Sequence, residues 1–154
     1  MPARLAFRPK KLAATIRLMP VTKTGWPQFL KSASAAHRRF AAQSGFKAGT
    51  GEFLALPGRD GGIERIVVGI PERESSDGAG NLFWTWAGLP LRLPAGSYRI
   101  DPEPQDGKLA TRIAIAWGIG SYAFDRYKKA ARLPAELVWP AKADRMAVES
   151  MVRA

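Results

Sequence analysis

The stretch AIAWGIGSYAFDRYKK, residues 114–129, decides the fold of this chain. Apolar residues recur through it and just before it at intervals of three, four and seven, which is the spacing of one helix face. They are Leu109, Ile113, Trp117, Phe124 and Tyr127. Gly118 and Gly120 interrupt the pattern, and each costs about 1 kcal/mol relative to alanine inside a helix. Close approach of a neighbouring backbone is the usual compensation, so we predict a packed helix over 109–129 with glycines at its contact points.

On both sides of this helix, strand patterns alternate with helix patterns. We expect strands over 13–19, 52–56, 63–70, 98–101 and 133–139, and further helices over 27–44, 82–88 and 142–154. The segments 52–56 and 63–70 flank a glycine-rich turn and predict a β-hairpin. Pro20 is expected to end the first strand, and Pro90 to follow the end of the helix over 82–88. This alternation favours an α/β fold with a mixed, largely parallel sheet.

Three segments resemble a known family. Residues 118–129, with Gly-x-Gly-Ser-Tyr-x-Phe-Asp-Arg-Tyr-Lys-Lys, are similar to the long helix that closes the N-terminal domain of leucyl (cytosol) aminopeptidases, a family of two-metal exopeptidases. Residues 86–98, WAGLPLRLPAGSY, resemble the passage before that helix, and residues 45–48, GFKA, with the strand and Pro-Gly turn after them, an earlier part of the domain. The resemblance covers about 12–154 and rests on packing motifs. It implies a three-layer sandwich similar to macro domains.

The family's catalytic half has no counterpart in this sequence. Its signature Asn-Thr-Asp-Ala-Glu-Gly-Arg does not occur, nor does its earlier Asp- and Lys-bearing metal segment. We therefore expect a flexible basic arm over 1–11, a macro-like N-terminal domain over 12–140, and over 141–154 the start of a helix leading to a C-terminal catalytic domain outside this sequence. No catalytic or metal-binding residue is expected here, and the isolated chain is expected not to be an enzyme.

The resemblance also implies what the parent enzyme does. It would remove N-terminal residues from peptides with two divalent metals, zinc or manganese, held in its catalytic domain. This chain would then have a structural, assembly or substrate-access role beside that domain, within a homo-oligomer that we expect to be a hexamer.

The charge of the chain is strongly positive and uneven. Lys and Arg number 24 against 13 Asp and Glu, giving a net charge of +11, and no acidic residue precedes Glu52. Such an excess raises the alternative of a basic nucleic-acid-binding module, although a solvated face is the simpler interpretation. The candidate anion or DNA contacts are Lys10, Lys11, Lys31, Arg38 and Arg39.

Several function classes are excluded or disfavoured by composition. The chain has no cysteine, which excludes disulfides and thiolate metal sites. No apolar run approaches the roughly 18 residues of a membrane helix, and the first residues do not form a secretory signal. We therefore expect no membrane partner and a cytoplasmic location.

Chemical motifs are few. His37 is the only histidine, and its neighbours Arg38 and Arg39 indicate an exposed helix face. The acidic residues after the hairpin and around 101–106 are interpreted as solvated loops. The loop 77–81, DGAGN, leaves an ADP-ribose or nucleotide site as a less favoured alternative. Trp84 and Trp86 are candidates for a domain or subunit interface, because aromatic side chains left exposed mark such surfaces.

Overall fold

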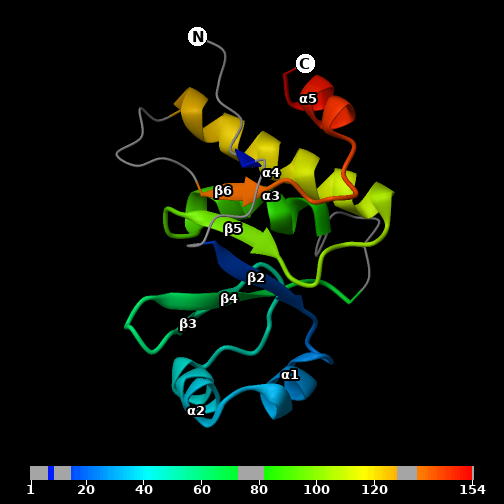
Figure 1. Ribbon diagram of the computed structural model, residues 1–154. Helices are drawn as coiled ribbons and strands as arrows, with labels where there is room; N and C mark the ends of the chain where they lie inside the picture. Colours follow the sequence, from blue (N-terminus) through cyan, green and yellow to red (C-terminus); the bar gives the residue numbers. More distant parts are fainter. Residues whose placement is uncertain (1–6, 9–14, 73–81, 128–134, 154) are drawn as a thin grey trace. The chain divides into compact units, whose positions relative to one another are not determined.

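The computed structural model describes residues 7–8, 15–72, 82–127 and 135–153 (Figure 1). The chain forms two compact units. One unit, here the contiguous unit, consists of residues 16–85, and the other, the split unit, consists of residues 1–15 together with 86–154. No helix in the described ranges is long and apolar enough to span a membrane.

Among its described residues, the contiguous unit contains three strands and two complete helices. Strands β2 (Ile16–Val21), β3 (Phe53–Pro57) and β4 (Ile63–Gly69) lie in the order β2-β4-β3. Strand β4 is central: it runs parallel to β2 and antiparallel to β3, which confirms the predicted hairpin. Helices α1 (Trp26–Ser32) and α2 (Ala35–Ser44) connect β2 to β3.

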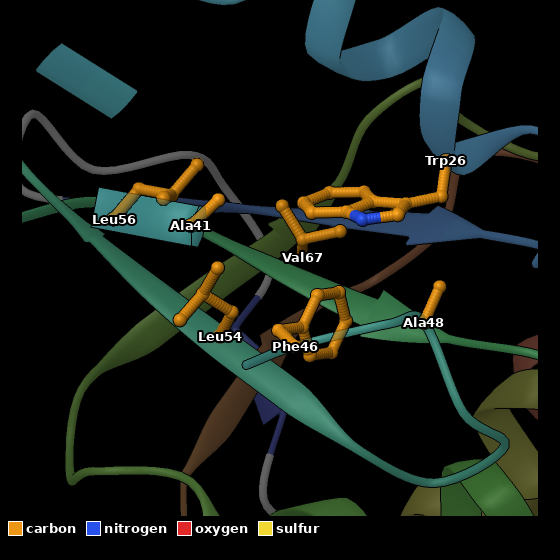
Figure 2. Packing of buried hydrophobic residues seen from close by; sticks show 7 residues of the cluster. All are labelled: Trp26, Ala41, Phe46, Ala48, Leu54, Leu56 and Val67. Atoms are coloured by element: carbon orange, nitrogen blue, oxygen red, sulfur yellow. The ribbon is translucent and has the colours of Figure 1, made fainter. Parts of the chain in front are cut away.

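The core of this unit is a cluster in which Trp26 lies over side chains of the hairpin (Figure 2). The Trp26 ring stacks on Phe29 with centroids 5.4 Å apart and meets Phe46 edge-on at 4.9 Å. The buried members of the cluster are Trp26, Ala41, Phe46, Ala48, Leu54, Leu56 and Val67. Helix α1 thus begins with the aromatic side chain that fixes it to the sheet.

Two predictions for this unit are wrong. Strand β2 continues through Pro20, which pairs with Val68. The Val21 carbonyl faces β4, where it accepts a hydrogen bond from the Ile70 amide. The backbone nitrogen of the preceding residue, Pro20, therefore points away from β4. The N–H that proline lacks thus costs no hydrogen bond to β4. The helix expected over 27–44 is two helices: Ala33 and Ser34 are extended, with ψ of 157° and 159°, and Ser34 caps α2 by accepting from the His37 amide.

The split unit contains strands β1 (Phe7–Arg8), β5 (Ser97–Ile100) and β6 (Glu136–Val138) in the order β1-β6-β5, all parallel. Its helices are α3 (Leu82–Arg92), whose residues 82–85 belong to the contiguous unit, α4 (Gly107–Tyr127) and α5 (Arg145–Arg153). Helix α5 packs on α4. Helix α4 confirms the prediction from the central stretch, with residues 128 and 129 lying outside the described ranges.

Two elements of this unit differ from the prediction. Phe7 and Arg8, inside the segment expected to be a flexible arm, form β1 beside β6. Helix α3 continues past Pro90 to Arg92 instead of ending at residue 88. Leu89 on this extension and Leu93 just after it are fully buried, and their burial, at about 1.5–3 kcal/mol each, offsets the roughly 3 kcal/mol that proline costs.

The two glycines of α4 are contact points, as predicted. A Cβ built on Gly120 would overlap the carbonyl oxygen of Ala87 and lie 2.9 Å from its carbonyl carbon. At Gly118 the nearest atom would be Cγ2 of Val152, at 2.7 Å. Helix α4 therefore approaches the backbone of α3 at Gly120 and a side chain of α5 at Gly118.

Candidate functional site

The predicted basic contacts fall into two groups. Lys10 and Lys11 lie outside the described residues. Lys31 is exposed at the end of α1, and Arg38 and Arg39 are exposed on α2, so the structure places these three on neighbouring helices of the contiguous unit. Arg38 already donates to the carbonyl of Ala33 at 3.0 Å, which leaves Lys31 and Arg39 as the more available pair.

His37 lies in a different environment from the one predicted. Its side chain is buried, not solvated, because α2 restarts at Ser34 and the helical phase shifts by one residue. The buried positions become Ala33, His37 and Ala41, while Phe40 is 39% exposed. The prediction of an exposed histidine was therefore wrong, although its neighbours Arg38 and Arg39 are exposed as expected.

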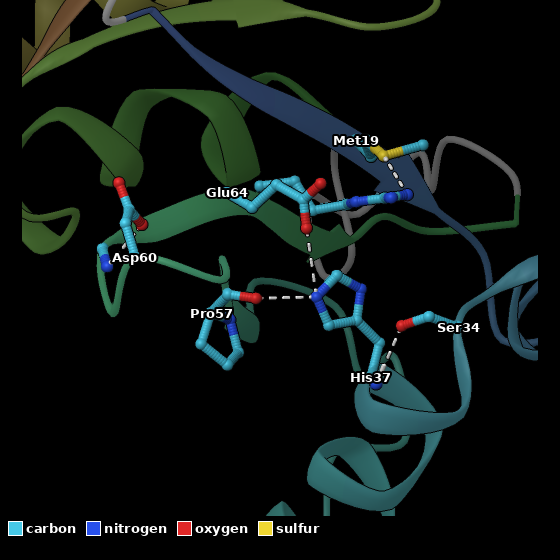
Figure 3. Close-up of polar contacts among 8 residues, drawn as sticks. Met19, Ser34, His37, Pro57, Asp60 and Glu64 are labelled. Atoms are coloured by element: carbon cyan, nitrogen blue, oxygen red, sulfur yellow. Dashed lines mark hydrogen bonds and ion pairs between the residues drawn. The ribbon is translucent and has the colours of Figure 1, made fainter.

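The His37 ring connects α2 to the hairpin (Figure 3). Its Nε2 lies 2.8 Å from the Pro57 carbonyl oxygen and 3.2 Å from Oε2 of Glu64. Because both partners are acceptors, Nε2 carries a proton, and the two oxygens share this N–H donor. Nδ1 is buried and has no partner among the described residues. This arrangement pins one helix to both strands of a hairpin, and it provides neither a nucleophile nor a metal cluster.

Glu72 forms a second long-range connection that local sequence patterns do not signal, because its partner is 48 residues away. The Thr24 amide donates to Oε1 at 2.8 Å, and the Thr24 hydroxyl donates to Oε1 and Oε2 at 2.9 and 3.0 Å. These bonds, the backbone one first, lower the pKa of Glu72 below its ordinary value of 4.5. The carboxylate thus holds the residues just after β4 at the turn that leads into α1.

Replacing Glu72→Gln is expected to destabilise the chain slightly near neutral pH, since the amide accepts weaker hydrogen bonds than a carboxylate. A lowered folded-state pKa gives stability that is present above the unfolded pKa and is lost as pH falls through the folded one. The difference between the variants should therefore shrink below about pH 4.5. Urea unfolding at about pH 7 and about pH 3.5 measures this difference in stability. Glu149→Gln, at an exposed position of α5, is the matched control. An unchanged difference at both pH values would contradict the carboxylate's role.

The two candidate interface tryptophans differ in how far they are buried. Trp84 is 62% exposed and lies edge-on to Phe83, with centroids 5.2 Å apart. Trp86 is 1% exposed and belongs to the interior. Only Trp84 therefore presents its ring at the surface for contact with a partner.

An open hollow of about 570 Å³ lies at the start of α4 and escaped the sequence analysis. Its lining residues are Gly107, Lys108, Thr111, Arg112, Lys142 and Asp144. The Thr111 hydroxyl donates to the Gly107 carbonyl and accepts from the Asp144 amide, and Asp144 caps α5 by accepting from Ala147. These hydrogen bonds join the start of α4 to the start of α5.

Metal-ligating side chains do not converge in the part of the chain that the structure describes: no three His, Asp or Glu side chains there could hold an ion. The loop 77–81, on which the nucleotide alternative depends, lies outside that part. The described residues thus form hydrogen-bonded connections between elements and exposed surfaces.

A family model described as the M17 aminopeptidase N-terminal domain matches residues 16–140. A curated relative, the probable cytosol aminopeptidase of Leifsonia xyli subsp. xyli, is 34% identical over 91 residues, or 57% of this chain and 17% of the relative. The crystal structure of the cytosol aminopeptidase from Coxiella burnetii superposes with a TM-score of 0.79 at 25% identity, covering 96% of this chain and 31% of that one. This likeness confirms the predicted α/β class with a mixed, largely parallel sheet.

The bottromycin maturation enzyme BotP has the same fold at lower similarity. Its TM-score is 0.55 at 23% identity, covering 90% of this chain and 30% of that one. The chain thus spans less than a third of the length of each of these proteins.

Proposed function

Because this chain belongs to the M17 aminopeptidase family through that family's N-terminal domain, we propose that it is the non-catalytic N-terminal domain of a leucyl aminopeptidase. The observation that carries the proposal is the family match over 16–140, together with a shared fold that covers 31% of a cytosol aminopeptidase. The cytosol aminopeptidase relative also supports a cytoplasmic location for the parent protein.

In this proposal the chemistry belongs to the parent's catalytic domain. Two divalent metals there, zinc or manganese, would activate a water molecule and polarise the peptide carbonyl. The described residues of this chain hold no cluster that could bind such an ion. Their contribution is a packed scaffold that docks on the catalytic domain, helps to build a homo-oligomer, which we expect to be a hexamer, and shapes access to the reacting peptide.

The isolated chain is expected to fold and to leave a leucyl-anilide substrate intact, with or without added Zn²⁺ or Mn²⁺. Circular dichroism checks folding, and release of the anilide measures turnover, with a full-length cytosol aminopeptidase as the positive control. Metal-dependent turnover that coelutes with the chain on size exclusion, and is lost when the chain is unfolded, would contradict the proposal.

Docking on the catalytic domain is tested most directly at Trp84, because its ring is exposed. The probe is the catalytic domain of a homologous cytosol aminopeptidase, expressed without its own N-terminal domain. Trp84→Ala is expected to weaken its association with this chain by about tenfold or more, because exposed aromatic anchors dominate interfaces. Phe40→Ala, which removes another partly exposed ring, is the matched control. Equal affinities for Trp84→Ala and the unaltered chain would contradict this role.

A second candidate function, nucleic-acid binding, is favoured by the exposed Lys31 and Arg39 on neighbouring helices and by the absence of acidic residues before Glu52. We expect duplex DNA binding to weaken steeply between about 50 and 200 mM salt. The double change Lys31→Gln, Arg39→Gln should lower affinity and reduce the salt slope by about one for each phosphate that is no longer neutralised. Lys108→Gln with Lys142→Gln, on the split unit, is the control. Binding that ignores salt would contradict this function.

A further inference from the structure

The side chain of Phe7 joins the first strand to the residue that follows β6. Phe7 pairs with Leu137 in the parallel ladder between β1 and β6, and its side chain is only 9% exposed. Its ring stacks on Trp139, with centroids 4.1 Å apart and planes at 16°. A ring stack contributes beyond the burial of its area, so the position of Trp139 depends on Phe7.

The last helix, α5, meets Trp139 at its start, and near its end Val152 shares a neighbour, Gly118, with Phe7. At its start, the Arg145 guanidinium carbon lies 5.2 Å from the centre of the Trp139 ring, in cation–π range. Near its end, Val152 packs over Gly118 beside Phe7. The Cβ position built on Gly118 is 2.7 Å from Cγ2 of Val152 and 3.4 Å from Cε2 of Phe7.

Helix α5 is held otherwise by its packing on α4, by the Asp144 cap and by the bond from the Asp144 amide to Thr111. It is nine residues long, which is too short for a helix to be stable in water by itself. Its side chains buried in the described structure are Val148 and Val152, whereas Met146 and Met151 are 83% and 58% exposed. The helix therefore depends on packing, and Phe7, at the opposite end of the sequence, stacks on the Trp139 ring that Arg145 of α5 contacts.

We infer that β1 is a strap that holds α5 on α4, with Phe7 as its positioning residue. Release of β1, by proteolysis or by pairing with another strand, frees α5 while the remaining strands and helices stay folded. The chain thus contains a conformational device in which the state of its first strand controls the docking of its last helix. This inference does not depend on the proposed aminopeptidase function.

Cysteine reactivity in the whole chain tests the strap. The sequence has no cysteine, so Val152→Cys introduces a single thiol, buried at a position 5% exposed, whose alkylation rate reports the opening of α5. In this background, Phe7→Ala is expected to raise the alkylation rate about tenfold or more. Phe40→Ala, which removes a phenylalanine from the contiguous unit, is expected to leave the rate unchanged.

Amide hydrogen exchange separates local release from general destabilisation. Exchange in α5 should rise with Phe7→Ala, while exchange in β5 and β4 stays near that of the unaltered chain. Phe7→Leu keeps an apolar side chain but removes the ring stack, and should give an increase of about two- to tenfold, which secures the test if Phe7→Ala does not fold. An unchanged alkylation rate in a folded Phe7 variant, or an equal rise of exchange in α5 and β5, would overturn the inference.

Discussion

Gly120→Ala is expected to lower the free energy of unfolding by about 2–3 kcal/mol, although alanine is the better helix former. The added Cβ would overlap the carbonyl oxygen of Ala87, and this atom belongs to the backbone of α3, where no side-chain rotation can relieve the clash. The helix-propensity gain of about 1 kcal/mol is smaller than the cost of forcing two packed helices apart. The net effect is therefore destabilising.

Two other glycines supply the controls for this prediction. Gly88 lies in α3 with no atom within 4 Å of its Cβ position, so Gly88→Ala should be neutral or stabilise the chain by up to about 1 kcal/mol. Gly118→Ala meets the Val152 side chain instead of backbone, so its cost should fall between those of the other two. Equilibrium urea unfolding followed by circular dichroism measures the order, and a Gly120→Ala chain as stable as the original would refute the close approach of α3 and α4.

Trp26→Ala is expected to cost about 3–5 kcal/mol, the range for removing a large buried aromatic side chain. Trp26 is 8% exposed, stacks on Phe29 and meets Phe46 edge-on, so its removal leaves a cavity between α1 and the hairpin (Figure 2). A loss of this size is a large part of the roughly 5–15 kcal/mol that stabilises a typical domain. We therefore expect the contiguous unit to unfold at a clearly lower temperature than in the unaltered chain.

Trp84→Ala is the matched control, because it removes the same side chain from a site that is 62% exposed. It should change the free energy of unfolding by less than about 0.5 kcal/mol. Thermal unfolding of both variants, followed by amide exchange in β3 and β4, measures the difference. Equal losses for the two variants would show that the cluster around Trp26 does not hold the contiguous unit together.

The sequence was sufficient to predict the class of fold and most of its elements, because their signals are local. Helix α4 follows from the three-, four- and seven-residue spacing of its apolar side chains, and the hairpin from two β-rich segments around a glycine turn. The contact role of Gly118 and Gly120 also followed, since a glycine inside a helix needs a compensating neighbour.

Tertiary context decided what local signals could not. Pro90 breaks an isolated helix, yet α3 continues because Leu89 and Leu93 are buried on either side of it. A single cap at Ser34 shifts the phase of α2, which moves His37 into the interior and Phe40 toward the surface. Neither effect can be predicted without knowing which side chains are buried by tertiary packing.

The roles of the candidate site residues stay predictions, and the structure adds how exposed each described side chain is. Lys31 and Arg39 are exposed, as charged residues on helices usually are, whereas no local pattern separates the exposed Trp84 from the buried Trp86 two residues further on. The connection between Thr24 and Glu72 and the stack of Phe7 on Trp139 join residues far apart in the chain, so neither leaves a spacing that a sequence pattern can detect.

The pairing of β1 with β6 sets an order for events on the ribosome. The contiguous unit needs only residues 16–85 and can form as soon as they emerge, whereas Phe7 must wait for Leu137, about 130 residues later. At synthesis rates of about 5–20 residues per second, that delay is on the order of ten seconds. During this interval β1 has no partner strand from its own chain. A chaperone that binds the nascent chain and covers β1 would therefore protect it from aggregation.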